Sequence, residues 1–392
     1  MISETKLYTG NQMKNKLTTF LLTIIMIILL SFIILVGFVL FSDMGENSAD
    51  QIYKFVGEDT IEDSSNTVEN KISIKDENVT EKLKAFFSLN ESNQNKEYSY
   101  SAKSSESNYY YNQLNSVEKI IYNGIQESKE NMKSGTYVIN YGNKFADILS
   151  KENGSEILGE YYQAAIEAFT HDNVDMFYLN ANKLFLNIEM TKKLTKTTYN
   201  VYISPEQNKT YYLDGFTSEA QVTEAISRIE MVKDNVIASL TGNTYKDILR
   251  VHDYLVDNIE YDTSYKSIGS YGIYGALVKN TCVCEGYAKA FKYLANAGGI
   301  ECELVQGNAT NSEGKVESHA WNAVKINDKW YYLDTTWDDP VIIGGGTLTA
   351  RNKYRYFLKG KETFKKDHTE INQFTENGKN FSYPEVNNMD YR

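Results

Sequence analysis

The segment Leu17–Phe41, LTTFLLTIIMIILLSFIILVGFVLF, carries no charged side chain over 25 residues. Such a run is long enough to cross the roughly 30 Å hydrocarbon layer of a membrane with some tilt. Lys14 and Lys16 lie directly before it, and Asp43, Glu46 and Asp50 follow it. The positive-inside rule therefore places residues 1–16 in the cytoplasm and everything after residue 42 outside the cell. A cleaved signal peptide is the alternative, but the run is too long for its apolar region and no small-x-small site follows directly. We therefore expect an uncleaved transmembrane anchor over residues 17–41.

The rest of the chain has the composition of a globular protein with few thiols. The 392 residues of the whole chain suffice for two domains, or for one large domain plus extensions, and its formal net charge is −12. An acidic balance of this size disfavours general attraction to nucleic acid or to anionic lipid. All three cysteines lie beyond residue 280. They are too few for a disulfide framework in an exported chain, so we expect at least one of them to serve reactivity.

Two segments of different composition follow the anchor. Residues 42–112 are rich in Ser, Asn, Glu and Lys and have almost no periodic apolar pattern, which predicts a disordered stalk or linker. Residues 113–243 form a predicted helical region with a hairpin. Apolar spacing predicts helices over VEKIIYNGIQESKENM, Ile157–Thr170 and Ala181–Leu194. Alternation predicts a hairpin of TYNVYI with TYYLDGF around SPEQNK, and Ser218 can cap a further helix with Gln221.

Residues 244–345 combine helical and extended patterns in an order typical of an α+β domain. Helical spacing runs over Thr244–Asn258 and again over CEGYAKAFKYLANA, which ends at two glycines. ECELVQG, HAWNAVKI and KWYYLDTTW then alternate as strands. Asn327 and Asp328 suit a tight turn with positive φ between the last two strands. We expect residues 346–392 to form a C-terminal extension packed on this core.

Cys284 is the second cysteine of CVC and falls in the first turn of the predicted helix. The free N–H groups and the positive dipole end of a helix start favour a thiolate there, whereas Cys282 lies before the helix and lacks that environment. A cysteine nucleophile needs a base, and the base needs an orienting partner. If the strand turn holds two residues, the register places His319 and Asp334 diagonally on one face of the sheet, within reach of one hydrogen bond.

The blocks CEGYA, HAWN and WYYLDTTWDDP, in this order, resemble the bacterial transglutaminase-like domains of the papain-like cysteine enzyme group, which also includes peptide N-glycanases and kyphoscoliosis-type peptidases. The resemblance covers residues 244–340, with similar flanks in RVHDYLVDNIEYD and YRYFL. It implies a papain-like core, in which a helix carrying Cys packs on an antiparallel sheet carrying His and Asp. It also implies Cys284 as nucleophile and oxyanion donor, His319 as general base and acid, and Asp334 as the group that fixes the imidazole tautomer. No cofactor is implied.

Other residues carry weaker signals. Cys282 and Cys284 with one distant histidine are too few ligands for a zinc site, and Cys302, in an alternating strand, is expected in the core. An oxidising compartment would allow a disulfide of Cys282 with Cys302 or with Cys284, and the short loop of the latter would be strained. Trp321 is a candidate aromatic wall beside the cysteine, and Tyr287 is a candidate support for the site. The remaining histidines are expected in packing (His252) and in surface or local hydrogen-bonding roles (His171, His368).

These features predict acyl transfer through a thioester. Water as acceptor would make the enzyme a peptidase or amidase, and an amine would make it a cross-linking transglutaminase; the same three residues serve both. The predicted location outside the membrane favours surface proteins or cell-wall peptides as substrates, with one transmembrane helix as the membrane contact and no nucleic-acid partner. The non-enzymatic alternative is an envelope adhesion or scaffold module that retains the fold with weak or no turnover.

Overall fold

A computed structural model describes residues 108–193, 196–339, 350–375 and 378–392 of the chain. The predicted anchor at 17–41 and nearly all of the predicted stalk at 42–112 lie outside these residues. Within the part of the chain that the structure describes, no helix has both the length and the apolar character needed to cross a bilayer. The anchor therefore stays a prediction.

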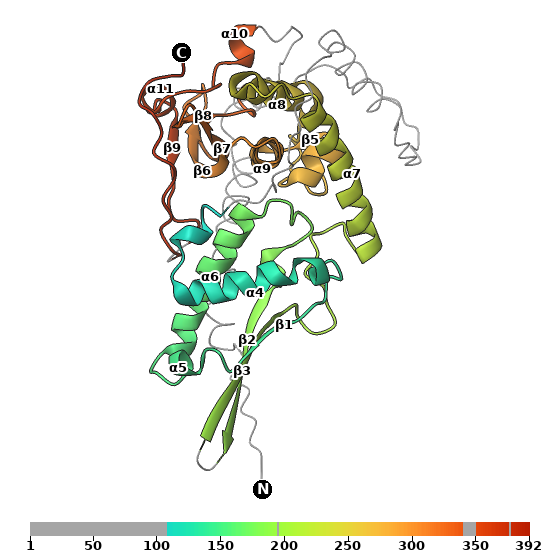
Figure 1. Cartoon of the computed structure of the whole chain (residues 1–392), viewed down its shortest axis with the longest axis vertical. Helices are drawn as coiled ribbons and strands as arrows, with labels where there is room; N and C mark the ends of the chain where they lie inside the picture. The colour runs from blue at the N-terminus through green and yellow to red at the C-terminus, as the bar shows by residue number, and fades with distance from the viewer. Residues whose placement is uncertain (1–107, 194–195, 340–349, 376–377) are drawn as a thin grey trace, which may run out of the picture. The chain divides into compact units, whose positions relative to one another are not determined.

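The first half of the described chain combines helices with a small antiparallel sheet (Figure 1). Its α-helices are α4 (Ser116–Met132), α5 (Ala146–Leu149) and α6 (Gly154–Asp172), with 3₁₀ turns η2 (Tyr111–Gln113) and η3 (Ala181–Lys183). Its strands are β1 (Ile139–Gly142), β2 (Phe185–Lys193) and β3 (Lys196–Ser204), in the order β1-β3-β2. Helix α4 begins at Asn115, whose side chain forms a capping box with Glu118. The predicted helices at VEKIIYNGIQESKENM and Ile157–Thr170 are confirmed.

Two predictions for this half are wrong. The predicted helix Ala181–Leu194 is mostly strand β2, in which Leu186 and Ile188 are buried at every second position. The predicted hairpin around SPEQNK is also wrong, because TYNVYI lies in β3 and pairs with β2, the strand before it. The pairing runs from Phe185 opposite Ser204 to Lys193 opposite Lys196. The following TYYLDGF contributes only an isolated bridge between Tyr212 and Leu179. The period-two burial of β2 outweighed the helical spacing that the sequence suggested.

The second half contains a helical layer and a four-stranded antiparallel sheet, as the predicted α+β arrangement requires. Its helices are α7 (Glu219–Ala238), α8 (Thr244–Asn258), the π-helix η4 (Gly275–Lys279), α9 (Cys284–Ala297), α10 (Ala350–Lys353) and α11 (Lys361–Phe364). Strands β6 (Cys302–Thr310), β7 (Val316–Ile326), β8 (Lys329–Leu333) and β9 (His368–Glu370) pair in the order β8-β7-β6-β9. Two short parallel strands, β4 (Glu260–Tyr261) and β5 (Thr281–Cys282), lead to α9.

Helix α9 packs against β6 and β7 on one side and against α7 and α8 on the other (Figure 1). It follows that α9 is buried along most of its length, with Phe291 and Leu294 fully inaccessible. The predicted cap of α7 by Ser218, which accepts from the Gln221 N–H, is confirmed. The two-residue turn between β7 and β8 is also confirmed, with φ of 51° at Asn327 and 58° at Asp328.

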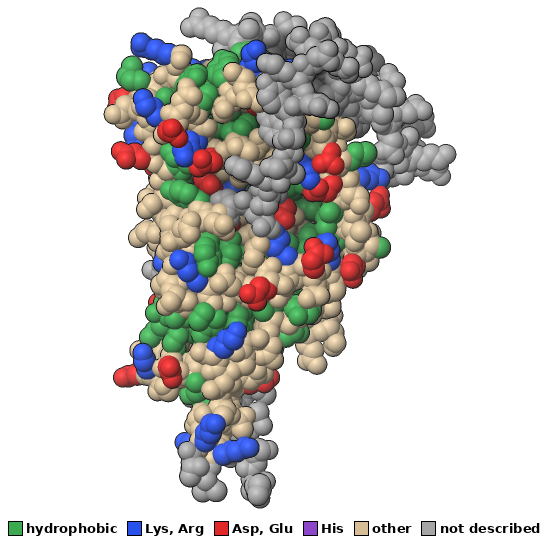
Figure 2. Space-filling model, in the orientation of Figure 1, with side chains coloured by type: hydrophobic (Ala, Val, Ile, Leu, Met, Phe, Trp, Pro, Cys, Tyr) green, Lys and Arg blue, Asp and Glu red, His purple; other side chains and the backbone are tan. Residues whose placement is uncertain are grey.

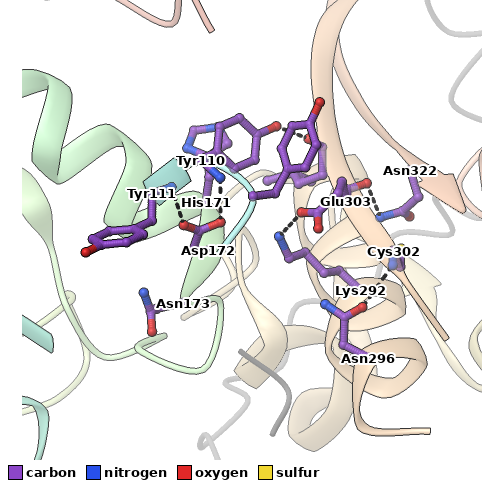
Figure 3. A network of polar contacts seen from close by, with 12 residues as sticks. Tyr110, Tyr111, His171, Asp172, Asn173, Lys292, Asn296, Cys302, Glu303 and Asn322 are labelled. Carbon is purple, nitrogen blue, oxygen red and sulfur yellow. Dashed lines mark hydrogen bonds and ion pairs between the residues drawn. The ribbon is translucent and has the colours of Figure 1, made fainter. Parts of the chain in front are cut away.

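Residues before α4 are part of this core, which corrects the predicted end of the stalk at residue 112. Tyr110 is 0% exposed, and its hydroxyl donates to the Leu304 carbonyl of β6 at 2.5 Å. The Asp172 carboxylate at the end of α6 accepts the backbone N–H groups of Tyr110 and Tyr111 at 3.1 and 2.8 Å (Figure 3). The segment before α4 is polar in composition, but it is ordered because the Tyr110 ring is buried and the Asp172 carboxylate binds its backbone.

The same region contains a buried ion pair between α9 and β6. The Lys292 ammonium, with a fully buried side chain, lies 2.7 Å from the Glu303 carboxylate (Figure 3). It also lies 5.7 Å from the centre of the Tyr110 ring. The segment that precedes α4 therefore covers a charged contact on the back of the helix that begins with Cys284.

The outer surface carries both signs of charge. On the face drawn in Figure 2, Lys and Arg side chains are interspersed with Asp and Glu. Several of the described pairs are local, such as Lys133 with Glu130 at 2.6 Å and Lys365 with Glu362 at 2.7 Å. Mixed charges of this kind produce no strong field of one sign over that face.

Candidate active site

The structure places Cys284 at the first residue of α9, after the extended residue Val283. Cys284 is partly exposed, whereas Cys282 and Cys302 are buried, and all three thiols are free. Burial raises the pKa of the Cys282 thiol well above its ordinary value, and the nearby Cys284 sulfur raises it further. The pKa of Cys302 is raised by burial as well. Of the pair in CVC, Cys284 is the thiol that solvent can reach at a helix start.

The first turn of α9 is seated against the loop that follows β4. The Val283 N–H donates to the Ser270 carbonyl at 3.1 Å. A Cβ atom on Gly286 would lie 2.5 Å from that same carbonyl oxygen and 2.5 Å from the Cys282 Cβ. Glycine is therefore required in CEGYA, because backbone and a buried side chain occupy the space that any other residue would need.

His319 lies on β7 and Asp334 follows β8, and the register between these strands is the predicted one, with Ile326 opposite Lys329. The His319 Nε2 is 2.8 Å from the Asp334 Oδ2. The ladder ends at Leu333, so the carboxylate is presented at the start of a turn rather than along an extended strand. Its Oδ1 accepts the backbone N–H groups of the next turn, from Thr336 at 2.9 Å and Trp337 at 3.2 Å.

The electrostatics of this pair favour a charged ring. Burial opposes protonation of His319, but the Asp334 carboxylate and a hydrogen bond with Cys284 outweigh it and raise the pKa of His319 to about 10. Burial likewise opposes ionisation of Asp334, yet the His319 contact holds the pKa of that carboxyl well below its usual range. Because Nε2 faces Asp334, Nδ1 is the ring nitrogen left for the Cys284 sulfur. The structure thus brings the three predicted residues together as thiol, imidazole and carboxylate.

Both predicted supporting residues are buried. Trp321 is 1% exposed and stacks beside the His319 ring, with centroids 6.0 Å apart. It therefore packs beside the histidine in the core. Tyr287 is also buried, and its hydroxyl contacts the Ile259 carbonyl at 3.1 Å and the Asp339 carboxylate at 2.6 Å. It ties α9 to the segments on either side of the site.

Trp337 and His368 were missed as site residues. Trp337 is partly buried, and its ring lies 5.4 Å from His319 and 4.5 Å from His368. His368 was expected at the surface or in local contacts, but it is 4% exposed and its Nε2 lies 3.3 Å from the Asp334 Oδ2. Trp337 lies in the block WYYLDTTWDDP, three residues after Asp334, and this motif could have pointed to it. His368 has no such signal, because its place at the site depends on the short strand β9.

The other two histidines are buried in contacts with other residues. His252 is fully buried and contacts Asp253 at 3.1 Å and Asp338 at 3.2 Å, which agrees with the predicted packing role. His171 is also buried, and its Nδ1 contacts the Glu167 carbonyl one helical turn earlier at 2.8 Å, which agrees with the predicted local hydrogen bonding. Burial lowers the pKa of His171 to about 3, so its ring is neutral at physiological pH.

Among the residues that the structure describes, one group of side chains has atoms that a metal ion could use. The donor atoms of His319, Asp334 and His368 all lie within 4.8 Å of one another. The 2.8 Å between the His319 and Asp334 atoms is shorter than the roughly 3.3 Å between ligands around tetrahedral zinc. Hydrogen bonds already account for these contacts, so we describe the group as a hydrogen-bonded network.

Residues 230–335 match the family model of the Transglutaminase-like superfamily. This region is a transglutaminase-like domain. It contains Cys284, His319 and Asp334 and ends before His368. The match covers the helix and the strands that assemble the thiol, imidazole and carboxylate.

Two kinds of relatives resemble the chain over part of its length. It is 26% identical over 153 residues to kyphoscoliosis peptidase of Homo sapiens, an alignment that covers 34% of this chain and 22% of that protein. The chain thus spans about a fifth of the length of this curated relative. Among solved structures, a TGase is 16% identical with a TM-score of 0.27, covering 45% of this chain and 50% of its own. The periplasmic domain of TgpA from Pseudomonas aeruginosa is 18% identical with a TM-score of 0.23, covering 36% and 56%. At these TM-scores we take no evidence of activity from the structural matches.

Proposed function

We propose that the chain is a cysteine enzyme that transfers an acyl group from a carboxamide or peptide bond through a thioester on Cys284. The observation that carries the proposal is the hydrogen-bonded series from Cys284 through His319 to Asp334, with its partly exposed sulfur at a helix start. A nucleophile, a base and an orienting carboxylate in this order are the parts that covalent acyl transfer requires.

The steps follow from the positions of the three groups. The Cys284 thiolate attacks the carbonyl carbon, and the Cys284 N–H, free at a helix start, stabilises the charge on the oxygen. As the carbon–nitrogen bond breaks, the protonated His319 ring gives its proton to the departing nitrogen. His319, now neutral, takes a proton from the acceptor as the acceptor attacks the thioester, and the thiolate leaves. Asp334 holds the ring orientation throughout.

The acceptor decides the reaction class. Water gives a peptidase or amidase, and a primary amine gives protein cross-linking. With the anchor at 17–41, the domain acts outside the cell membrane, and surface proteins or cell-wall peptides are its substrates. This location is supported by the apolar run and its flanking charges.

Alkylation of the full-length protein by iodoacetamide at graded pH tests the proposal. A thiolate paired with an imidazolium reacts well below the pH range of an ordinary thiol, whose pKa is about 8.5. The low-pH reaction should disappear in Cys284→Ala and should move to ordinary thiol pH in His319→Ala. Retention of the low-pH reaction in both variants would refute the enzyme and favour the scaffold alternative.

The reaction class is tested separately. Envelope proteins are incubated with the enzyme and a tagged primary amine and are then examined by mass spectrometry. Tagged glutamines indicate amine transfer, and new chain termini indicate hydrolysis. Cys284→Ala serves as the matched control for both products.

A further inference from the structure

His368 reaches the site from outside the region that matches the family model. It lies on β9, a three-residue strand at the edge of the sheet, where it pairs with Ala309 of β6. A second backbone hydrogen bond, from the Thr310 N–H to the Asp367 carbonyl at 2.7 Å, fixes the start of this strand. The position of His368 is thus set by the sheet and not by a free loop.

Both ring nitrogens of His368 face carboxylates. Nε2 lies 3.3 Å from the Asp334 Oδ2, and Nδ1 lies 2.7 Å from the Asp367 Oδ1. Since an ionised carboxylate only accepts, both contacts are satisfied when each ring nitrogen carries a hydrogen. The ring is held in place by aromatic neighbours, with centroids 4.0 Å away at Phe364 and 5.1 Å away at Trp321.

The Asp334 carboxylate is therefore surrounded by four donors. Its Oδ1 accepts two backbone N–H groups, and its Oδ2 accepts from His319 and from His368. With His319 as the sole partner of Oδ2, the carboxylate could tilt toward that ring and follow its movements. A second ring on the same oxygen, itself held by Asp367, prevents this tilt. Asp367 is held in turn by the Tyr356 hydroxyl, which donates to its Oδ2 at 2.8 Å.

We propose that His368 is a positioning residue, which holds the Asp334 carboxylate and, through it, the His319 ring in the orientation that proton transfer with Cys284 requires. The inference rests on the proposed acyl transfer. When His319 gives its proton to the leaving nitrogen, Asp334 loses the positive partner on one side. The contact with His368 then keeps the carboxylate ionised and in place until His319 is protonated again.

Two substitutions of similar size separate the contacts of His368. In His368→Gln, the side-chain amide reaches the position of Nε2 and can still donate to Asp334. In His368→Asn, the amide reaches only the position of Nδ1, so the contact with Asp367 is retained and the contact with Asp334 is lost. The measurement is the rate of Cys284 alkylation by iodoacetamide between about pH 5 and pH 9, on full-length protein.

We expect His368→Asn to lower the low-pH rate by about 10- to 100-fold, as for other outer partners that orient a functional histidine, and to shift the profile toward that of an ordinary thiol. His368→Gln should stay within about 3-fold of the wild type, on the same reasoning. Thermal unfolding of each variant is recorded alongside. A purely structural role would lower the unfolding midpoint of both variants and leave the pH profile of the folded fraction unchanged.

The outcomes for the two proposals are distinct. If the wild type itself lacks low-pH reactivity, the acyl-transfer proposal fails and the role of His368 fails with it. If the wild type has that reactivity and both His368 variants keep its rate and profile, the enzyme stands and the positioning role is refuted. The positioning role is also refuted if both variants lose the low-pH alkylation rate equally and in proportion to their loss of stability.

Discussion

Replacing Lys292 with methionine tests how firmly the back of α9 depends on its buried ion pair. The ammonium lies 2.7 Å from the Glu303 carboxylate, and the exposed fractions of the two side chains are 0% and 9%. Methionine fills a similar volume without charge. The substitution therefore leaves the packing of α9 almost intact and removes the cation that balances Glu303.

The expected change in the free energy of unfolding follows from the attraction between the two charges and the opposing cost of their desolvation. At 2.7 Å and an effective dielectric constant near 20, the attraction between the charges is about 6 kcal/mol. Desolvation of the two ions cancels several kcal/mol each, so the pair as a unit is close to neutral. Removing only Lys292 leaves the Glu303 carboxylate buried without its cation, and we expect a loss of about 3–5 kcal/mol in the free energy of unfolding. Removing both charges, in Lys292→Met with Glu303→Leu, should return stability to within about 1 kcal/mol of the wild type.

The assay is urea unfolding followed by tryptophan fluorescence, because all three tryptophans lie on or beside the strands of this domain. The control is Lys365→Met. Its partner Glu362 is also 2.7 Å away, but the side chains are 58% and 55% exposed, so the loss should be under about 1 kcal/mol. A Lys292→Met variant no less stable than this control, or a double variant whose loss equals the sum of the single losses, would refute the reasoning.

Three further predictions concern the site. Asp334→Asn should lower the low-pH alkylation rate of Cys284 by at least about 100-fold, because an amide has one acceptor oxygen and no charge, so it cannot accept from both the backbone N–H groups and the histidines as the carboxylate does; a loss under 3-fold would contradict this. Gly286→Ala should destabilise the protein by about 1–3 kcal/mol and reduce alkylation, because its Cβ would lie 2.5 Å from backbone oxygen; Gly272→Ala, with its nearest atoms at 3.8 Å, is the control. The pKa of His319 is raised from 6.5 to about 10, so the folded state binds more protons in that range and stability should fall as pH rises through it. In His319→Gln, urea unfolding at the same pH values should lack this loss of stability. If the free energy of unfolding changes with pH in parallel for the two proteins, His319 does not contribute to the pH dependence.

Local patterns predicted the second half of the fold well. The turn at Asn327 and Asp328 needs positive φ at both residues, and this requirement fixed the register that places His319 near Asp334. The helices over Thr244–Asn258 and from Cys284 also have the predicted bounds. The Asn243 side chain caps the start of α8, and Gly298 follows the last residue of α9, so these boundaries carry local signals that the sequence shows.

The first half was predicted less well because its signals are ambiguous over short stretches. FLNIEMTKK satisfies both a helical and an extended spacing, and pairing with β3 decided between them. The end of the stalk was missed for a related reason. Tyr110 stands in a polar segment, and only its contacts with Asp172 and Leu304, distant in the sequence, show that the segment is ordered.

Segments from both flanks of the matched region complete the core of this domain. On one side, Tyr110 covers the Lys292–Glu303 contact behind α9. On the other side, β9 pairs with the edge of β6 and carries His368 to the carboxylate that orients His319. Residues 230–335 alone would expose a buried ion pair and leave part of a strand edge unpaired, and each of these disfavours the folded state. The thiol, imidazole and carboxylate are therefore recognisable from the middle of the chain, but the environment that holds them depends on contacts with residues on both sides, which no local pattern encodes.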